Sequence, residues 1–504
     1  MRVLPFLFEV TLCLVDLLVT TQTLAPTSEN STMKMKKVLL ALALASTTCL
    51  QQSDAQDNSQ PWMGSVLSQS GASNVRHVGD GPSSDDATGR LTLYDDQRPQ
   101  QFKSQGRYVS SNHPHAPDTP SYSAVAPTAA SCSTSCGSLT SQLCSSAPLS
   151  SLGWFEAESL LWFGQRRYSP PLVTTAPQGV SPALGSTGVV SQLGGGDGIS
   201  AGLLPGFRLA AGFYLDDCQK IGIGGRAYGI FTAREEYSNT STGNPSIGIP
   251  FYNTNTNLND AYLIALRQGA VAASDGSVTA TSDLDMIGAE GSARFLVARS
   301  CDYRVDFLGG YTFNRLQDSI AINANAIDRF TGNLIPDGTQ VRTLDLFDAD
   351  NVFNGGHLGL QTTVHRNRMS LTSLLKVSLG NMHESVRIDG FSVQTNPVPN
   401  PGTVAYRGGV LAQQSNIGTL ERNQFAFLPE LGAKLGYSVD CNLQLTCGYT
   451  FMYWSHVALA GRQIDSTVDY SQALGGTAGN RPAFNFQESS FWMQGVDLGL
   501  NYTF

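Results

Sequence analysis

Acidic and basic side chains occur at every second position within several apolar, aromatic segments of the chain. Glu156 and Glu158 lie in GWFEAESLLWFG, and Arg304 and Asp306 lie in CDYRVDFLGGYTF. Spacing by two places such charges on one face of a β-strand, where they can form ion pairs or contact a polar solute. Placing alternate residues of all the expected strands inward gathers the full set in the lumen: Glu156, Glu158, Arg208, Arg226, Glu290, Arg294, Arg304, Asp306, Glu430, Lys434 and Asp497.

A second group of residues has the types needed for acid–base hydrolysis. His357 follows the segment DLFDADNVFNGGH, which holds Asp345, Asp348 and Asp350. A histidine beside carboxylates can act as a general base. We interpret this segment as a loop, and acidic loop residues are usually only solvated. We therefore expect no catalytic residues, no enzyme activity, no metal site and no cofactor.

The cysteines form a third group with possible chemistry. Cys218, Cys301 and Cys441 occupy equivalent positions in three tight turns, and Cys132, Cys136 and Cys144 lie in a polar segment before the first apolar strand. Disulfides between the two groups are possible in an oxidising compartment. Small unpaired thiols are the alternative, and CSTSC alone is too little for a zinc site.

Tight turns and period-two segments predict the elements that position these residues. Four hairpins turn at DDCQ, RSCD, HRNR and VDCN, and further strands are expected at 153–164 and 489–504, which gives about ten strands. An even number of antiparallel strands is typical of single-chain outer-membrane barrels, which have short turns at one end and long loops at the other. The long polar connections are expected at 165–203, 235–277, 326–351, 391–420 and 461–487.

The C-terminal segment DLGLNYTF indicates which solvent surrounds these strands. Every second residue from Trp492 to Phe504 is apolar except Gln494, and most of the residues between them are polar or glycine. We predict an all-β fold, a transmembrane antiparallel β-barrel with lipid outside. Tyr502 and Phe504 are then the expected assembly signal. A secreted β-sandwich explains the alternation too, but it explains the aromatic residues near strand ends and the terminal phenylalanine less well.

Composition limits the partners and the kind of membrane span. The 504-residue chain has a net charge of −9, which argues against a surface that follows nucleic-acid phosphates. The body of the chain lacks the run of about 18 apolar residues that a membrane helix needs. The expected partners are outer-membrane lipid and the barrel-assembly machinery, with no nucleic acid, and the sequence leaves the oligomeric state open.

The N-terminal third predicts export. Residues 33–55 have the basic start, apolar centre and small-residue exit of a signal peptide, and residues 1–32 are interpreted as an upstream start-site artefact. Residues 56–150 are rich in Ser, Gln, Asp, Pro and Gly, which predicts a disordered periplasmic tether. The barrel is expected over residues 151–504, in the bacterial outer membrane.

Three segments resemble a known family. WFEAESLLWF, then PPLVTTAP, then GFRLAAGFYLDDCQKIGIGGRAY are similar to the putative β-barrel porin-7 family of bacterial outer-membrane proteins. The resemblance covers residues 153–504 and is most specific in its first third and last strand. It implies an outer-membrane barrel with porin-like passage of small solutes or ions and no catalytic residues.

The balance of charges leaves two hypotheses for the lumen. A ten-strand barrel is only slightly wider than the eight-strand size that side chains fill, so the charges are expected to form an ion-paired plug. A narrow solute path lined by the same residues is the alternative. A solute path corresponds to porin-like passage of small solutes or ions. A plugged lumen corresponds to the alternative function, a surface-exposed structural or adhesion barrel.

Overall fold

The structure is a computed structural model that describes residues 152–196, 198–200, 202–269, 271–329, 336–397, 401–477 and 479–504. The predicted start-site artefact (1–32), signal peptide (33–55) and polar tether (56–150) lie outside the described residues.

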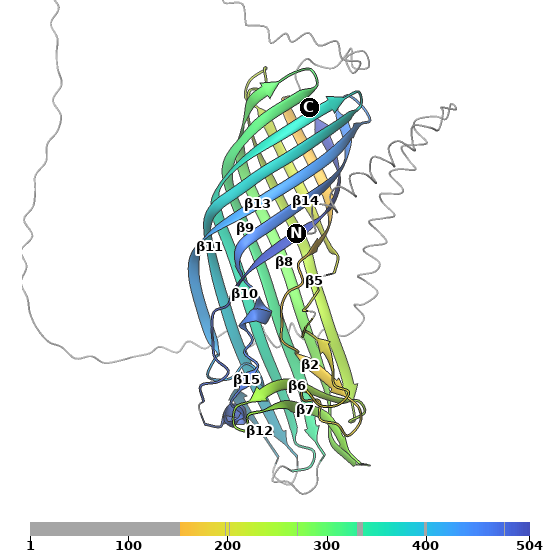
Figure 1. Cartoon of the computed structure of the whole chain (residues 1–504), viewed down its shortest axis with the longest axis vertical. Helices are drawn as coiled ribbons and strands as arrows, with labels where there is room; N and C mark the ends of the chain where they lie inside the picture. Colours follow the sequence, from red (N-terminus) through yellow and green to blue (C-terminus); the bar gives the residue numbers. More distant parts are fainter. Residues whose placement is uncertain are drawn as a thin grey trace, which may run out of the picture. The chain divides into compact units, whose positions relative to one another are not determined.

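Ten antiparallel strands close into a barrel (Figure 1). Around the wall the order is β8, β5, β4, β1, β16, β14, β13, β11, β10 and β9, and the pairing of β9 with β8 completes the ring. The predicted transmembrane barrel of about ten strands is confirmed. The wall strands are β1 (Gly153–Gly164), β4 (Leu204–Tyr214), β5 (Ile221–Ser241), β8 (Val271–Arg299), β9 (Tyr303–Asp328), β10 (Gln340–Arg366), β11 (Met369–Asn396), β13 (Gly418–Ser438), β14 (Leu443–Ala458) and β16 (Glu488–Thr503).

The tight turns lie at one end of the barrel, which we call the short-turn end. They are residues 215–220, 300–302, 367–368 and 439–442, and β1 begins and β16 ends beside them. Asp216 explains the first turn, because its carboxylate accepts hydrogen bonds from the backbone N–H groups of Lys220 and Ile221, both at 2.8 Å. Gln219 has a φ of 55°, so this turn includes a left-handed residue.

The long connections are all at the opposite end, but several are shorter than predicted. They cover 165–203, 242–270, 329–339, 397–417 and 459–487, so most of the expected loop at 326–351 and the two ends of the one at 391–420 belong to wall strands. The segment SIAINANAI shows why. Ile320, Ile322 and Ala324 face inward and are buried, whereas polar or small residues alternate with them on the outside. Beyond the lipid, the outer face of a strand meets water and can be polar, while its inner face is apolar and packs in the core. The many polar residues of such a strand make its sequence look like that of a loop.

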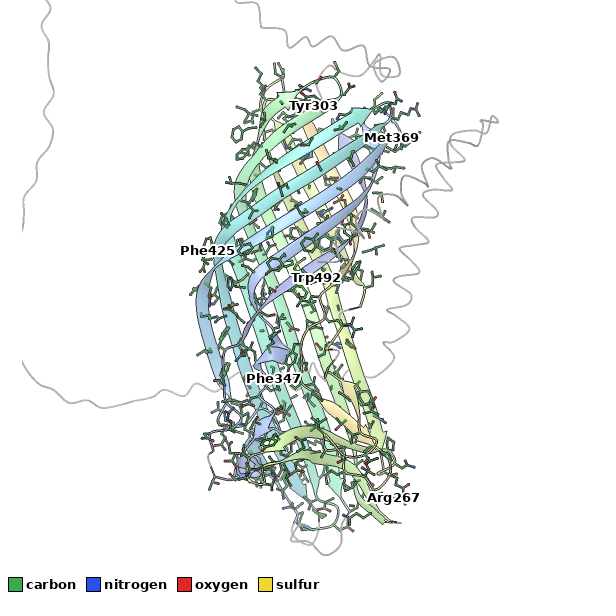
Figure 2. The ribbon with its side chains drawn as sticks, in the orientation of Figure 1. Arg267, Tyr303, Phe347, Met369, Phe425 and Trp492 are labelled. Carbon is green, nitrogen blue, oxygen red and sulfur yellow. The ribbon has the colours of Figure 1, made fainter. Side chains whose placement is uncertain are left out.

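An apolar band surrounds the wall next to the short-turn end. On β9 the outward positions from Tyr303 to Phe313 are aromatic, apolar or glycine, and the next outward position is Arg315. Ten residue steps of about 3.3 Å on a strand tilted by about 40° give a height of about 25 Å, as expected for a lipid-facing band. Phe425, at the edge of the barrel in Figure 2, also points outward, and Trp492 lies on the outer face because it alternates with the buried Phe491 and Met493. Among the described residues, no helix is long and apolar enough to cross a membrane.

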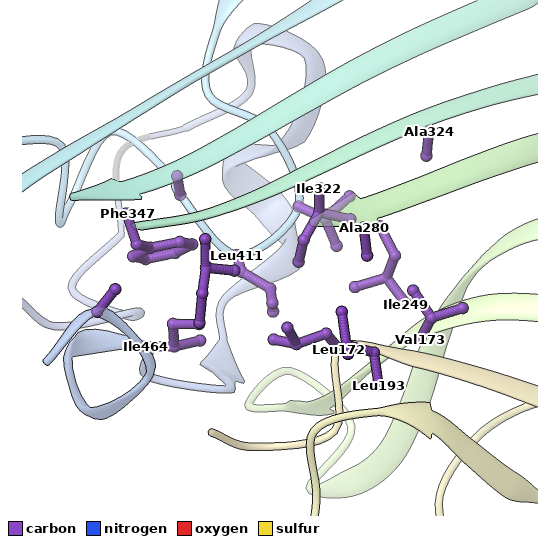
Figure 3. Close-up of a cluster of buried hydrophobic side chains, with 14 of the residues drawn as sticks. Leu172, Val173, Leu193, Ile249, Ala280, Ile322, Ala324, Phe347, Leu411 and Ile464 are labelled. Carbon is purple, nitrogen blue, oxygen red and sulfur yellow. The ribbon is translucent and has the colours of Figure 1, made fainter. Parts of the chain in front are cut away.

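Beyond the band, the long strands and the long connections build a second folded region, which we call the distal cap. Its connections contain β2 (Val173–Ala176), β3 (Val190–Leu193), β6 (Ser246–Asn253), β7 (Leu258–Gln268), β12 (Gly402–Arg407), β15 (Thr467–Val468), η1 (Ala460–Gln463) and η2 (Tyr470–Gly475). Leu172, Ile249, Ile322, Phe347 and Leu411 meet in one buried apolar cluster (Figure 3). The PPLVTTAP segment therefore supplies core residues to this cap.

Candidate functional site in the barrel lumen

Arg208 on β4 lies at the centre of the first group of inward charges. Its guanidinium forms ion pairs with Glu158 on β1 and with Asp497 on β16, the latter at 2.8 Å between Nη2 and Oδ2. Trp162 Nε1 donates a hydrogen bond of 2.7 Å to the other oxygen of Asp497. Lys434 reaches from β13 to Glu158 at 2.6 Å and also pairs with Glu156.

A second group is centred on Arg226 of β5. Arg226 forms a bidentate pair with Glu430 on β13, at 2.7 and 2.6 Å, and an ion pair of 2.8 Å with Glu290 on β8. Lys376 on β11 contacts both carboxylates and lies 2.7 Å from Glu430. Because β5 and β13 are not neighbours in the wall, the Arg226–Glu430 pair crosses the lumen.

The third group lies nearest the short-turn end. Asp306 on β9 pairs with Arg304 at 2.7 Å and lies 3.9 Å from Arg294 of β8. The Arg294 guanidinium is stacked over Trp154 and that of Arg304 over Tyr214, each 4.8 Å from the ring centroid. These stacks fix two long side chains against the wall while keeping their charges near Asp306.

All eleven predicted lumen residues are therefore in ion pairs on the inner side of the barrel, and we call them together with Lys376 the charged layer. Sequence reasoning missed Lys376, which is only 3% exposed in its side chain. Alternation indicates only weakly which face of β11 is the inner one near Lys376, because the inward residue Leu374 is as apolar as the outward residues Leu375 and Val377. The structure also pairs charges of strands that are not neighbours, as Arg226 and Glu430 show.

The bulges of the wall do not disturb these assignments. The register of β5 with β8 shifts between Ile230 and Ala233, which is beyond Arg226 on the side away from the short-turn end. The shift in β14 falls between Trp454 and Val457, also beyond the charged layer. A third shift, in β8 between Leu296 and Ala298, comes after Arg294, the last inward charge of that strand, and leaves the faces of Glu290 and Arg294 unchanged. Simple alternation therefore holds through the segment where the charges lie.

A layer of apolar side chains closes the lumen beyond the charged layer. It includes Trp162, Phe353, Trp454 and Phe491, each at most 1% exposed, and the rings of Trp454 and Phe491 have centroids 5.9 Å apart. We call it the apolar layer, and every wall strand contributes to it. Its residues are Leu160, Trp162, Leu204, Tyr228, Ile230, Ala233, Leu284, Met286, Leu316, Phe353, Met382, Ala426, Leu428, Met452, Trp454, Val457, Leu459, Phe491 and Met493.

A cavity of ≈ 570 Å³ lies on the other side of the charged layer, and we call it the vestibule. Its wall includes Glu156, Arg294 and Lys376 from the charged layer. Ser300 and Asn442, from two of the tight turns, also line it, so the vestibule lies at the short-turn end. In the described residues the lumen therefore has a polar chamber at one end and is filled by side chains further in.

The acidic residues and the histidine considered for hydrolysis do not form a site. Their segment is part of β10, not a loop, because its inward positions pack in the barrel. Asp345 lies twelve residues from His357 on the same strand, a separation of about 40 Å. His357 is buried and its Nδ1 lies 2.7 Å from the Thr312 hydroxyl. Asp350 faces outward and pairs with Arg315 at 2.8 Å.

Asp345 instead has a structural role in the distal cap. Its Oδ1 accepts hydrogen bonds from the backbone N–H groups of Val410, Leu411 and Ala412 at 2.8, 3.0 and 2.7 Å. Burial raises the pKa of the Asp345 carboxyl to about 7, although these three donors act in the opposite direction. Within the described ranges, no group of three or more His, Cys, Asp or Glu residues is placed to hold a metal ion.

The predicted assembly residues lie on the outer surface, at the seam where the barrel closes. Phe504 is 62% exposed and its ring stacks on that of Tyr502, with centroids 6.2 Å apart. The backbone of Phe504 exchanges two hydrogen bonds with Gly153, of 2.9 and 3.0 Å. The last residue therefore pairs with the first strand.

The turn cysteines lie around the short-turn end. Cys218, Cys301 and Cys441 are each disulfide-bonded, and Cys447 on β14 is free. Cys132, Cys136 and Cys144 lie outside the described residues.

Comparisons with known proteins give one family and several distant structures. The family described as Putative beta barrel porin-7 matches residues 154–504, which is more than half of the chain. A search of curated proteins finds no match.

The similar solved structures include three barrels. The outer membrane protease OmpT from Escherichia coli is 10% identical, with a TM-score of 0.28, and the match covers 70% of this chain and 97% of OmpT. A Pseudomonas aeruginosa FadL homologue is 10% identical, with a TM-score of 0.21 and coverage of 70% and 90%. The Pseudomonas putida toluene transporter TodX is 8% identical, with a TM-score of 0.17 and coverage of 71% and 91%. The family match agrees with the resemblance in the first strand and the PPLVTTAP segment, and the chain belongs to the Putative beta barrel porin-7 family.

Proposed function

We propose that this protein is a non-enzymatic barrel of the bacterial outer membrane that anchors the distal cap at the cell surface while its lumen stays closed. In this orientation the short-turn end faces the periplasm and the long connections face outward, as in other barrels of this type. Outer-membrane lipid surrounds the apolar band, and the barrel-assembly machinery inserts the chain.

The observation that supports this proposal is the apolar layer. A removable plug would come from a loop or a separate domain, but this layer is built by side chains of all ten wall strands. Opening it would require many buried aromatic and aliphatic side chains to leave close packing, which costs about 1.5–3 kcal/mol for each large side chain exposed. The charged layer adds a second obstacle, because its ion pairs cross the lumen.

Conductance across a planar lipid bilayer tests the proposal. The mature chain should insert, as shown by co-flotation with vesicles and a β-rich circular dichroism spectrum, and should give no steady current. The double variant Trp162→Ala/Trp454→Ala should give discrete conductance steps because it opens a gap in the apolar layer. Trp492→Ala is the matched control, since Trp492 lies on the outer face of the same wall, between the buried Phe491 and Met493. Steady ohmic steps from the unaltered protein would contradict a closed lumen.

Porin-like passage of small solutes or ions is the second candidate function. Membership of the porin-7 family and the vestibule with its charged lining support it. In this case the protein would need a second conformation in which both layers open. Swelling of vesicles that contain the unaltered protein, in solutions of small sugars or amino acids, would favour passage over anchoring.

A further inference from the structure

We propose that the rim at the short-turn end is a covalent docking surface for the segment of this chain that precedes β1. Three disulfide bridges would join the turn cysteines to the cysteines of that segment. The turn cysteines are Cys218, Cys301 and Cys441, and the segment cysteines are Cys132, Cys136 and Cys144.

The first argument is that an odd number of the described cysteines is disulfide-bonded. The described residues contain four cysteines, of which Cys447 is free and the three turn cysteines are disulfide-bonded. Three cysteines cannot all be paired with one another. At least one of them therefore has its partner outside the described residues.

The arrangement of the turns carries the second step. The turn with Cys218 and the turn with Cys441 flank the seam where the chain enters the barrel. On one side Tyr214 N donates to Leu152 O at 2.6 Å, and on the other Thr503 N donates to Asn442 O at 2.9 Å. Cys301 lies on the next turn beyond Cys218, and Arg299 Nη1 donates to the Cys218 carbonyl at 3.1 Å. The segment before Leu152 thus joins the barrel between two cysteine-bearing turns, and the third such turn is adjacent to one of them.

The reach of the chain carries the third step. Cys144 precedes Leu152 by eight residues, and Cys136 precedes Cys144 by another eight. An extended chain spans about 3.3 Å per residue, so each interval covers up to about 26 Å. That length is enough to lead from the seam to neighbouring turns. With Cys447 set aside, the chain after residue 55 holds six cysteines, three on each side of the proposed interface.

The chemistry is ordinary oxidation in an export compartment. Each bridge forms as two thiols lose two protons and two electrons to the disulfide of an oxidised thiol–disulfide exchange protein. Closing these loops removes conformations from the unfolded chain, which stabilises the folded barrel. It also fixes the polar segment at the mouth of the vestibule. The proposal is independent of whether the lumen conducts.

Mass mapping of the non-reduced mature protein from its native envelope tests the pairing. No Lys or Arg lies between Arg107 and Arg166, so trypsin leaves the three segment cysteines in one peptide, residues 108–166. The turn cysteines fall in three separate tryptic peptides, residues 209–220, 300–304 and 435–462. Free thiols are alkylated at mildly acidic pH before trypsin is added. This blocking prevents thiol–disulfide exchange during the digestion.

The expected product is peptide 108–166 linked to all three turn peptides, released together by a reducing agent. Cys218→Ser should remove only peptide 209–220 from this product. Cys447→Ser is the matched control and should leave the product unchanged, because Cys447 is free. A product that carries a single turn peptide would overturn three-point docking, and turn peptides linked to none of residues 108–166 would overturn the docking surface itself.

Discussion

Replacing Arg208 by methionine should destabilise the barrel by about 3 kcal/mol. Arg208 is 5% exposed, and the side chains of its partners Glu158 and Asp497 are 1% and 2% exposed. Removing one partner of a buried ion pair typically costs 3–5 kcal/mol, because the remaining charge is buried without compensation. The lower end applies here, since Lys434 still contacts Glu158 and Trp162 still donates to Asp497.

Urea unfolding of the protein in lipid vesicles, followed by tryptophan fluorescence, measures this loss. Arg315→Met is the control, because Arg315 pairs with Asp350 on the outer surface and is 42% exposed in its side chain. Exposed pairs contribute only about 0–1 kcal/mol. Adding Asp497→Asn to Arg208→Met should recover part of the stability by removing a buried negative charge. If Arg208→Met and Arg315→Met cost the same, the charged layer is solvated and the reasoning is wrong.

Three further predictions concern the cap, the last residue and the N-terminal segment. Because the folded pKa of Asp345 is about 7 and its ordinary value is 3.8, its contribution to cap stability is full below about pH 4 and is lost as the pH rises to 7. At 1.36 kcal/mol per pKa unit the change is at most about 4 kcal/mol. Asp345→Asn should abolish the pH dependence of the protection factors for amide hydrogen exchange at residues 410–412, which compare each measured rate with its intrinsic rate, and an unchanged dependence would contradict this. Deleting Phe504 should reduce surface assembly in cells but hardly change refolding in detergent, because its side chain is largely exposed and contributes little to packing. Equal losses in both assays would show that Phe504 acts through packing and not as an assembly signal. Protease should trim residues 56–150 from the folded protein and leave a β-rich, heat-modifiable core, whereas unfolding of the whole chain on cleavage would place the boundary elsewhere.

The sequence by itself determined the number of wall strands, the tight turns and the inner face of each charged strand. Period-two alternation fixes which side of a strand a residue occupies. Arg208, Arg226 and Glu430 could therefore be assigned to the inner side although the residues they pair with were not known. The bulges of β5 and β14 lie beyond these residues, so the alternation is unbroken in the part of each strand that holds them. The family could be named because its distinctive residues are local in the sequence.

Only the tertiary structure decided which charges meet and where the lumen closes. Arg226 and Glu430 are 204 residues apart, and their contact depends on the height of each strand in the closed ring. The apolar layer forms because all ten strands bring apolar side chains to one level. Alternation gives the side of a residue but not its height along the barrel axis, which is set by strand register and tilt after closure. For the same reason, the extension of β9 and β10 beyond the lipid was visible only once their inward residues were seen to pack against the cap.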